Sequence, residues 1–352
     1  MEHFYPELEE AIEDMRAQGD LYRPTAFWEL ACSQIEAELL DFGVERFRSL
    51  PLPLGYFVPT YGSPANGFTA EQIHALASCL SNKWPADIKP SIGLTQFLQG
   101  RLQALADYRV LLAADDKTRV PYLHEFSESE VGSPVGQWTF DGRRFSRSSL
   151  NYLLGLAFLK RNVPDFHFYT VLEVGGGFGT LGEVIATSGI KDVRYIDIDI
   201  PPTSFVAQYY LGEVLGKENV ATYSGTRDLS KIEIKNLPKV SVFSSWQIEN
   251  LVGNVDLFVN FISFQEMEPL VVRNYLDHAR RLGARYVLLR NLLEGKQKRN
   301  PGFSAGVETP VRGDDYAAML PGYRLIARNV HPFGYETVDG FHSELQLLQR
   351  IE

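Results

Sequence analysis

With 352 residues, of which 45% are hydrophobic and 22% charged, the chain can bury one large core or two ordinary ones, and its composition argues against disorder. The 34 basic and 44 acidic residues give a net charge of −10, which argues against a general affinity for nucleic acid, because such affinity comes from neutralising phosphates. Only two cysteines occur, Cys32 and Cys79, and no apolar run reaches the roughly 18 residues of a membrane helix. We therefore expect a cytoplasmic protein without a disulfide framework, zinc cluster, signal peptide or membrane segment.

Residues 1–126 are predicted to form a mainly helical region. Apolar residues recur at helical spacing in four stretches, residues 8–15, 30–40, 73–80 and 94–112. Prolines and glycines at residues 51–55 and 61–64 mark turns between the second and third stretch. No alternation of strands and helices occurs here. We interpret this region as a lid or substrate-recognition module, in which candidates to stack on a substrate ring are Tyr56, Phe57, Tyr61 and, beyond the region itself, Trp138.

Residues 127–352 are predicted to form an α/β domain. A loop over residues 127–141 precedes a helix that starts at Ser148 or Ser149 and ends before Pro164. From residue 170 onward, apolar strands alternate with helices, which indicates a mostly parallel sheet. The predicted strands are residues 171–174, 193–198, 240–243, 255–261, 285–290, 323–330 and 341–349, with helices up to about 188 and over 202–215 and 273–282. The short link 331–340 predicts a hairpin, and hence one antiparallel strand at the sheet edge. This is the Rossmann-like architecture of class I methyltransferases.

A glycine-rich turn, Glu173 to Gly179 with the sequence EVGGGFG, follows the first of these strands. Glycines at such a point let the backbone approach a ligand where a Cβ would collide. The nicotinamide-dinucleotide pattern G-x-G-x-x-G has threonine at its third position in the frame that begins at the strand end, and its formal match starts two residues late. The pattern E-x-G-x-G-x-G is met without a gap by Glu173, Gly175, Gly177 and Gly179. A carboxylate beside the loop suits the cationic methionine moiety of S-adenosylmethionine.

Other cofactor contacts are expected at the ends of the next strands. An acid after the second strand normally accepts hydrogen bonds from ribose hydroxyls, and both Asp197 and Asp199 stand there. We favour Asp199, because it immediately precedes the next helix. Ser245 and Trp246 follow the third strand, where the adenine ring would pack and where Trp246 could stack on it. Asn260 ends the fourth strand, beside the expected position of the methyl group.

The stretch from Glu173 through residues 195–202 (YIDIDIPP) to 209–211 (YYL), together with residues 260–267 (NFISFQEM), resembles the sugar O-methyltransferases of antibiotic and polysaccharide gene clusters. The likeness reaches upstream to residues 132–134 and 145–150, so it covers about residues 125–350. The resemblance implies an enzyme that transfers a methyl group from S-adenosylmethionine to a hydroxyl of a small-molecule acceptor, a sugar or glycoside.

Methyl transfer to a hydroxyl is a displacement at the sulfonium carbon, and it requires alignment and a base. His331 is the first candidate base, because it follows a predicted parallel strand and a histidine pKa of about 6.5 suits proton transfer near neutrality. Glu266, beyond the fourth strand, is the second candidate, and His342, at the start of the last strand, is the third. A magnesium ion held by carboxylates could assist such a base. No compact ligand motif identifies a metal site, so a metal stays open.

The leading hypothesis is therefore a sugar or glycoside O-methyltransferase. The alternative within enzymes is an O- or C-methyltransferase of a polyketide or another small natural product. An NAD-dependent oxidoreductase is disfavoured by the glycine frame, and a non-catalytic methyltransferase-like binding module is disfavoured by the intact glycine turn and ribose acids. The sequence predicts no nucleic-acid or membrane partner and leaves a homo-oligomer open.

Overall fold

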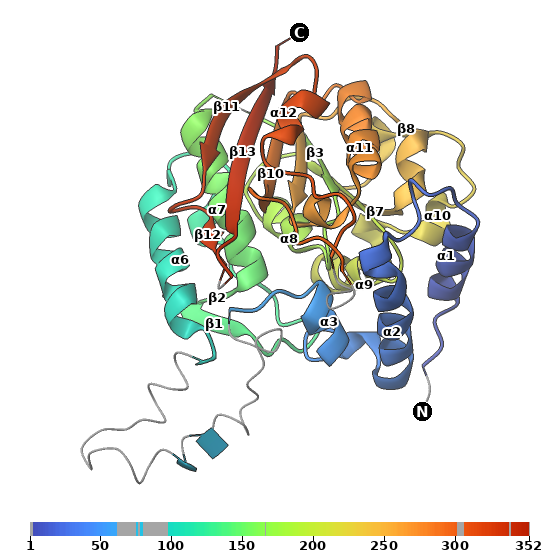
Figure 1. Ribbon diagram of the computed structural model, residues 1–352, viewed down its shortest axis with the longest axis horizontal. Helices are drawn as coiled ribbons and strands as arrows, with labels where there is room; N and C mark the ends of the chain where they lie inside the picture. Colours follow the sequence, from blue (N-terminus) through green and yellow to red (C-terminus); the bar gives the residue numbers. More distant parts are fainter. Residues whose placement is uncertain are drawn as a thin grey trace.

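A computed structural model of the chain describes residues 3–61, 75–76, 78–79, 98–165, 167–300, 306–337 and 339–351. A nine-stranded sheet forms its centre (Figure 1). The strands are β3 (Thr170–Val174), β4 (Arg194–Asp199), β5 (Val220–Ala221), β7 (Val240–Ser244), β9 (Leu257–Phe261), β10 (Tyr286–Leu292), β11 (Tyr323–Asn329), β12 (Tyr335–Glu336) and β13 (His342–Arg350). They lie in the order β11-β13-β10-β9-β3-β4-β7-β5, with β12 paired to β13.

The strand directions define the fold class. The pairs from β10 across to β5 are all parallel, whereas β13 runs antiparallel to both β10 and β11. We number the strands of this sheet along the chain, leave out the short β5 and β12, and read the sheet from β7 to β11. The order is then 3-2-1-4-5-7-6, which is the Rossmann-like sheet of class I methyltransferases. The dinucleotide-binding Rossmann sheet instead has the order 3-2-1-4-5-6. The predicted fold class is confirmed, with one refinement, because the antiparallel strand β13 lies one position inside the edge that β11 occupies.

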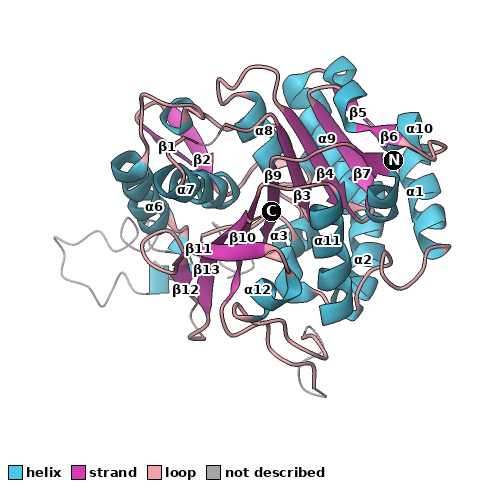
Figure 2. Ribbon diagram, turned by 90° about the horizontal axis from the view of Figure 1, so that it is seen from above, coloured by secondary structure: helices cyan, strands magenta, loops and turns pink. Residues whose placement is uncertain are grey.

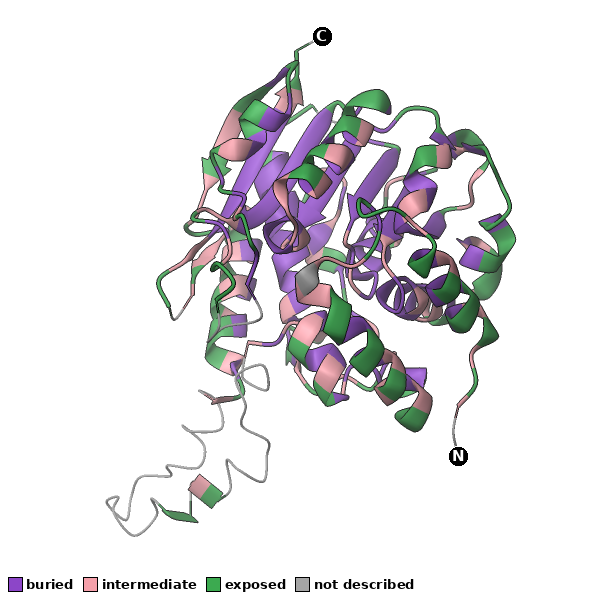
Figure 3. Ribbon diagram, turned by 45° about the vertical axis from the view of Figure 1, so that its right-hand side comes forward, coloured by how far each residue is buried: buried purple, intermediate pink, exposed green. Residues whose placement is uncertain are grey.

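All seven predicted strands are present, with ends within two residues of the prediction. Every residue of β3, β7 and β9 is buried (Figure 3). Strands covered on both faces give continuous apolar runs in the sequence, which explains why they could be recognised.

Helices cover both faces of the sheet (Figure 2). On one face lie α7 (Arg147–Asn162), α8 (Thr180–Ala186) and α9 (Thr203–Leu215), and on the other lie α11 (Pro269–Arg281) and α12 (Asp315–Met319). Alternate residues of a strand enter separate cores, so that Val171 packs with the α7 side and Leu172 with the α11 side. The α7 helix begins one or two residues before its predicted start, because the Ser146 side chain caps it by accepting from the Ser149 N–H.

The remaining elements are α1 (Pro6–Arg16), α2 (Ala26–Phe42), α3 (Pro51–Tyr56), α6 (Arg101–Ala114), α10 (Tyr223–Thr226), the hairpin β1 (Gln137–Phe140) and β2 (Arg143–Ser146), and the pair β6 (Ile232–Glu233) and β8 (Leu251–Val252). The helix predicted over residues 73–80 lies mostly outside the described residues. Phe47 and Phe57 belong to the same core as Phe178 and Leu181 of the sheet domain. The described part of residues 1–126 therefore shares its core with residues 127–352. No described helix has the length and apolarity that a membrane span requires.

Candidate active site

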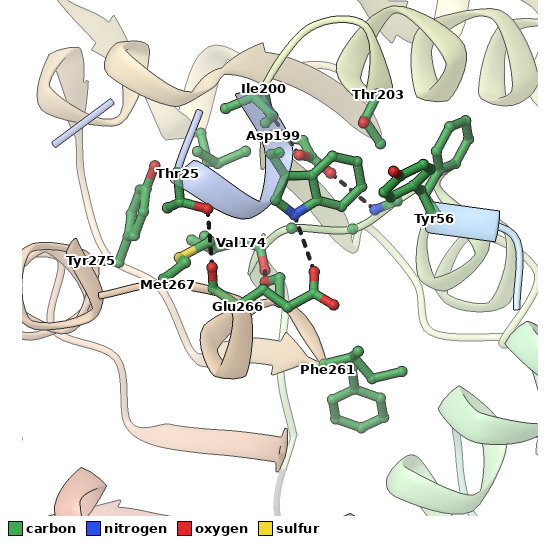
Figure 4. A pocket seen from close by; sticks show the side chains of 18 of the residues that line it. Thr25, Tyr56, Val174, Asp199, Ile200, Thr203, Phe261, Glu266, Met267 and Tyr275 are labelled. Carbon is green, nitrogen blue, oxygen red and sulfur yellow. Dashed lines mark hydrogen bonds between the residues drawn. The ribbon is translucent and has the colours of Figure 1, made fainter. Parts of the chain in front are cut away.

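A cavity lies at the carboxyl ends of β3, β4 and β9, the edge at which open α/β sheets bind ligands (Figure 4). The sheet contributes the glycine turn, Asp199 and Phe261 to its lining. The N-terminal region closes the opposite side with residues from two segments, Leu21, Pro24, Thr25 and Trp28 before or within α2, and Tyr56 and Phe57 at the end of α3. The predicted lid region is therefore in contact with the predicted cofactor edge.

The glycines of the turn have different roles. Gly175, Gly177 and Gly179 have φ of +74°, +62° and +91°, which favours glycine at each position. A Cβ at Gly175 would lie 2.1 Å from the Ser263 Oγ, and one at Gly179 would lie 2.7 Å from Leu211, so these two glycines serve packing. A Cβ at Gly177 would meet only the Phe57 carbonyl oxygen at 3.4 Å, and Gly177 lines the cavity. Gly177 is thus the glycine that leaves room for a ligand.

The two candidate ribose acids, Asp199 and Asp197, differ in whether they line the cavity. Asp199 lines the cavity, and its Oδ2 accepts from the Gly177 N–H at 3.0 Å while Oδ1 accepts from the Ile200 N–H at 2.7 Å. Asp197 is fully buried, does not line the cavity, and accepts from the Gly176 N–H at 3.1 Å. Asp199 is therefore placed to meet a ligand, whereas Asp197 holds the turn.

Glu173 lies beneath the turn instead of beside a ligand. Its side chain is fully buried, does not line the cavity, and accepts from the Tyr195 hydroxyl at 2.5 Å. A contact of Glu173 with the methionine moiety stays a prediction, and β3 directs this side chain into the protein interior. Burial raises the pKa of Glu173 to about 8 and that of Asp199 to about 7, and it raises the pKa of Asp197 as well. Of these three neighbouring carboxyl groups only Asp199 lines the cavity, where a cation on a ligand would favour its ionised form.

Neither Ser245 nor Trp246 lines the cavity. The Ser245 hydroxyl donates to the Tyr22 carbonyl oxygen at 2.7 Å, and the Trp246 ring packs edge-on against Tyr223 with centroids 5.8 Å apart. Ser245 therefore faces the N-terminal segment around Tyr22 and not the cavity. The apolar wall near Asp199 is formed instead by Ile200, Met267 and Tyr275, together with Leu21.

Asn260 does not line the cavity, so its contact with the cofactor stays a prediction. It is fully buried, and its Nδ2 donates to the Val174 carbonyl oxygen at 2.8 Å and to the Ser263 Oγ at 2.5 Å. It therefore ties the end of β3 to the loop after β9. Ile262 in that loop lines the cavity with a φ of +75°, which β-branched residues rarely adopt, and such strain is typical of functional sites. No pattern in the sequence indicates this conformation of Ile262.

The two candidate histidines lie away from the cavity. His331 is exposed and follows β11, the edge strand, which is four strand positions from β3, or about 19 Å at normal strand spacing. His342 begins β13, does not line the cavity, and places its Nδ1 2.6 Å from the Glu294 Oε1. Both follow or begin strands at the predicted edge of the sheet, but neither lines the cavity.

Glu266 is the one predicted base that lines the cavity. Its Oε1 accepts from the Lys296 ammonium group at 2.8 Å, its Oε2 accepts from the Trp28 indole N–H at 3.1 Å, and its backbone oxygen accepts from the Thr25 hydroxyl at 3.0 Å. Figure 4 shows Glu266 close to Thr25 and Met267, and the residue is 8% exposed. The carboxylate is therefore held by both the N-terminal region and the segment after β10.

Among the described residues, no group of three or more His, Cys, Asp or Glu side chains is arranged to hold a metal ion. Cys32 is a buried free thiol and Cys79 an exposed one.

No protein-family model matches this sequence, and no curated protein does. Solved structures resemble it. A SAM-dependent methyltransferase from Aquifex aeolicus is 17% identical with a TM-score of 0.37, over 58% of this chain and 94% of that one. The O-methyltransferase TomG from Streptomyces achromogenes is 14% identical with a TM-score of 0.36, over 57% and 79%. The mitomycin 7-O-methyltransferase MmcR is 12% identical with a TM-score of 0.38, over 97% of both chains. At these values the likenesses carry no argument about activity, and the fold is defined by the strand order.

Proposed function

We propose that the protein is an S-adenosylmethionine-dependent methyltransferase that acts on a hydroxyl of a sugar or glycoside. The assignment of the cofactor rests on one observation. Gly177 and Asp199 are hydrogen-bonded to each other and both line the cavity, in a sheet with the strand order of class I methyltransferases. The glycine leaves space for the methionine end, and the carboxylate can accept from ribose hydroxyls. The sugar acceptor is supported by the sequence resemblance and by the rings of Trp28, Tyr56 and Phe57, which line the same cavity.

The residues present fit this cofactor. Its adenine ring fits the apolar wall of Ile200, Met267 and Tyr275. When bound, S-adenosylmethionine supplies a methyl group on a positively charged sulfur. Phe261 and the rings of Trp28, Tyr56 and Phe57 line the cavity and would shield the reacting groups from water. One carboxylate oxygen of Glu266 accepts a hydrogen bond from Lys296 and the other accepts one from Trp28. Each oxygen therefore retains a lone pair that can take the proton of an acceptor hydroxyl.

The first prediction concerns cofactor choice. Calorimetry should detect binding of S-adenosylmethionine and S-adenosylhomocysteine, and no appreciable binding of NADH, because the turn lacks the frame that cradles a pyrophosphate. Binding of NADH without any response to S-adenosylhomocysteine would overturn the proposal. Radiolabelled methyl transfer to a panel of sugars and glycosides then tests the acceptor class.

The second prediction is a pH dependence that differs between substrate and product. Burial raises the pKa of Asp199 to about 7, the Glu266 carboxylate adds to the rise, and no lysine or arginine is among the groups that oppose it. A cation on the ligand favours the ionised carboxyl, so affinity for S-adenosylmethionine should rise with pH, by up to about tenfold per unit below pH 7 if one proton is released. S-adenosylhomocysteine, whose sulfur is neutral, should show a shallower rise. Calorimetry at pH 6 and pH 7 measures both slopes.

The variant Asp199→Asn is the control for this prediction. It cannot ionise at this position, so it should bind both ligands more weakly and flatten the pH dependence of S-adenosylmethionine binding. Equal slopes for the two ligands, or an unchanged slope in Asp199→Asn, would contradict this assignment.

A further inference from the structure

A group of polar side chains adjoins the cavity and has no role in holding the cofactor. We call it the two-arginine cluster, and it consists of Tyr61, Asp107, Arg147, Arg290 and Tyr335. The Arg147 guanidinium carbon lies 4.8 Å from the centroid of the Tyr335 ring and 5.8 Å from that of the Tyr61 ring. The Tyr61 hydroxyl donates to the Asp107 carboxylate. The cluster therefore joins residues from α6, α7, β10, β12 and the segment after α3.

The cluster lies next to two residues that line the cavity, although none of its own five residues does. Arg147 directly precedes Ser148, which lines the cavity at the start of α7. The Arg290 guanidinium carbon lies 5.3 Å from the centroid of the Phe261 ring, and Phe261 lines the cavity at the end of β9. Figure 4 shows Phe261 well apart from Tyr275, which belongs to the wall assigned to adenine. The cluster thus adjoins the place where an acceptor must enter.

The cluster has an excess of positive charge. It contains two guanidinium groups and one carboxylate, and within the described residues neither Arg147 nor Arg290 has a carboxylate oxygen within 4.0 Å. Arg290 is 1% exposed and donates through Nη2 to the carbonyl oxygens of Asn151 and Phe333, at 3.2 and 2.7 Å, while its Nε–H has no partner. A buried cation is costly unless an anion neutralises it. Burial raises the pKa of Tyr335, but the two arginines outweigh this effect and lower it overall.

Part of the cluster meets solvent, because Tyr61, Asp107, Arg147 and Tyr335 are each partly exposed. The Arg147 Nη1 donates to the Thr60 carbonyl oxygen at 2.9 Å, which fixes the guanidinium plane beside the two rings. A guanidinium offers paired N–H groups that match the oxygens of a carboxylate or a phosphate.

We propose that the two-arginine cluster binds an anionic group, a carboxylate or a phosphate, carried by the methyl acceptor. The acceptor is then a sugar acid or a sugar phosphate and not a neutral sugar. Arg147 contacts the anion, Arg290 adds positive potential from behind the Phe261 ring, and Tyr61 and Tyr335 border the sugar. This inference rests on the proposed function, because it assigns the acceptor of the same reaction.

The test titrates three probes into the protein saturated with S-adenosylhomocysteine: D-glucuronate, D-glucose 1-phosphate and methyl β-D-glucoside. At least one charged probe should bind about tenfold or more tightly than the glucoside, which is the scale of one hydrogen bond between charged groups. A preference for glucuronate identifies a carboxylate as the anion, and a preference for glucose 1-phosphate identifies a phosphate. Arg147→Gln should remove most of this advantage and leave the affinity for S-adenosylhomocysteine unchanged.

The matched control is Arg109→Gln, which removes the same charge from an exposed position on α6 and should change neither affinity. Three results overturn the inference: glucoside binding as tight as that of the charged probes, no binding of either charged probe, or unchanged binding in Arg147→Gln. Each of these is read with S-adenosylhomocysteine bound, so each leaves the proposed function standing. Failure of S-adenosylhomocysteine itself to bind is the distinct result that contradicts the proposed function.

Discussion

Gly177→Val should abolish detectable binding of S-adenosylmethionine while the protein stays folded. The backbone at Gly177 has a φ of +62°, and Gly177 lines the cavity. A Cβ at this position would have only the Phe57 carbonyl oxygen within 4 Å. A valine side chain would therefore occupy space that the ligand needs. An overpacking cost of about 3 kcal/mol corresponds to a loss of roughly a hundredfold or more in affinity. Calorimetry with S-adenosylhomocysteine measures the loss, and circular dichroism measures the fold.

Gly322→Val is the matched control for backbone strain. Gly322 has a φ of +86°, and a Cβ there would meet nothing within 4 Å. Both variants carry the cost of a non-glycine residue in the left-handed region, about 1–3 kcal/mol, but Gly322 does not line the cavity. It should lose stability to a similar extent and keep its affinity for the cofactor. Normal cofactor binding in Gly177→Val would remove the glycine turn from the proposed site.

The sheet could be predicted because its strands are buried on both faces. Continuous apolar runs such as β3 and β9, each followed by turn residues, have few alternative structures. The hairpin of β1 and β2 begins within the loop predicted over residues 127–141, although Trp138 and Phe140 alternate with polar residues before Asp141 and Gly142. Both turn residues have positive φ, the type of turn that an Asp-Gly pair favours. The sequence therefore carries a local signal for this hairpin.

The site could be predicted only where it is local in sequence. Gly177 and Asp199 follow directly from the ends of β3 and β4, and the structure places both on the cavity wall. Trp28 and Glu266 meet across 238 positions of sequence, so no spacing within the chain could reveal their contact. His331 follows β11 at the carboxyl edge of the sheet, as predicted. The spacing of strands along the chain does not show their order in the sheet, and that order puts β11 at the end of the sheet far from β3 and β4.

Glu266→Gln should lower kcat by about a hundredfold, the usual scale for loss of a general base, and should change the affinity for S-adenosylmethionine little. The amide has the shape of the carboxylate and can still accept from Trp28, but it cannot take the proton of a hydroxyl. Lys296, which loses its partner, retains some exposure to solvent and can be hydrated.

His331→Ala and His342→Ala are the comparison variants, and both should turn over near the wild-type rate because neither residue lines the cavity. Single-turnover methyl transfer separates chemistry from binding. If Glu266→Gln retained its rate while His331→Ala lost it, the base would be the histidine favoured by the sequence. If all three variants were fully active, alignment alone, with the proton lost to water, would account for the reaction.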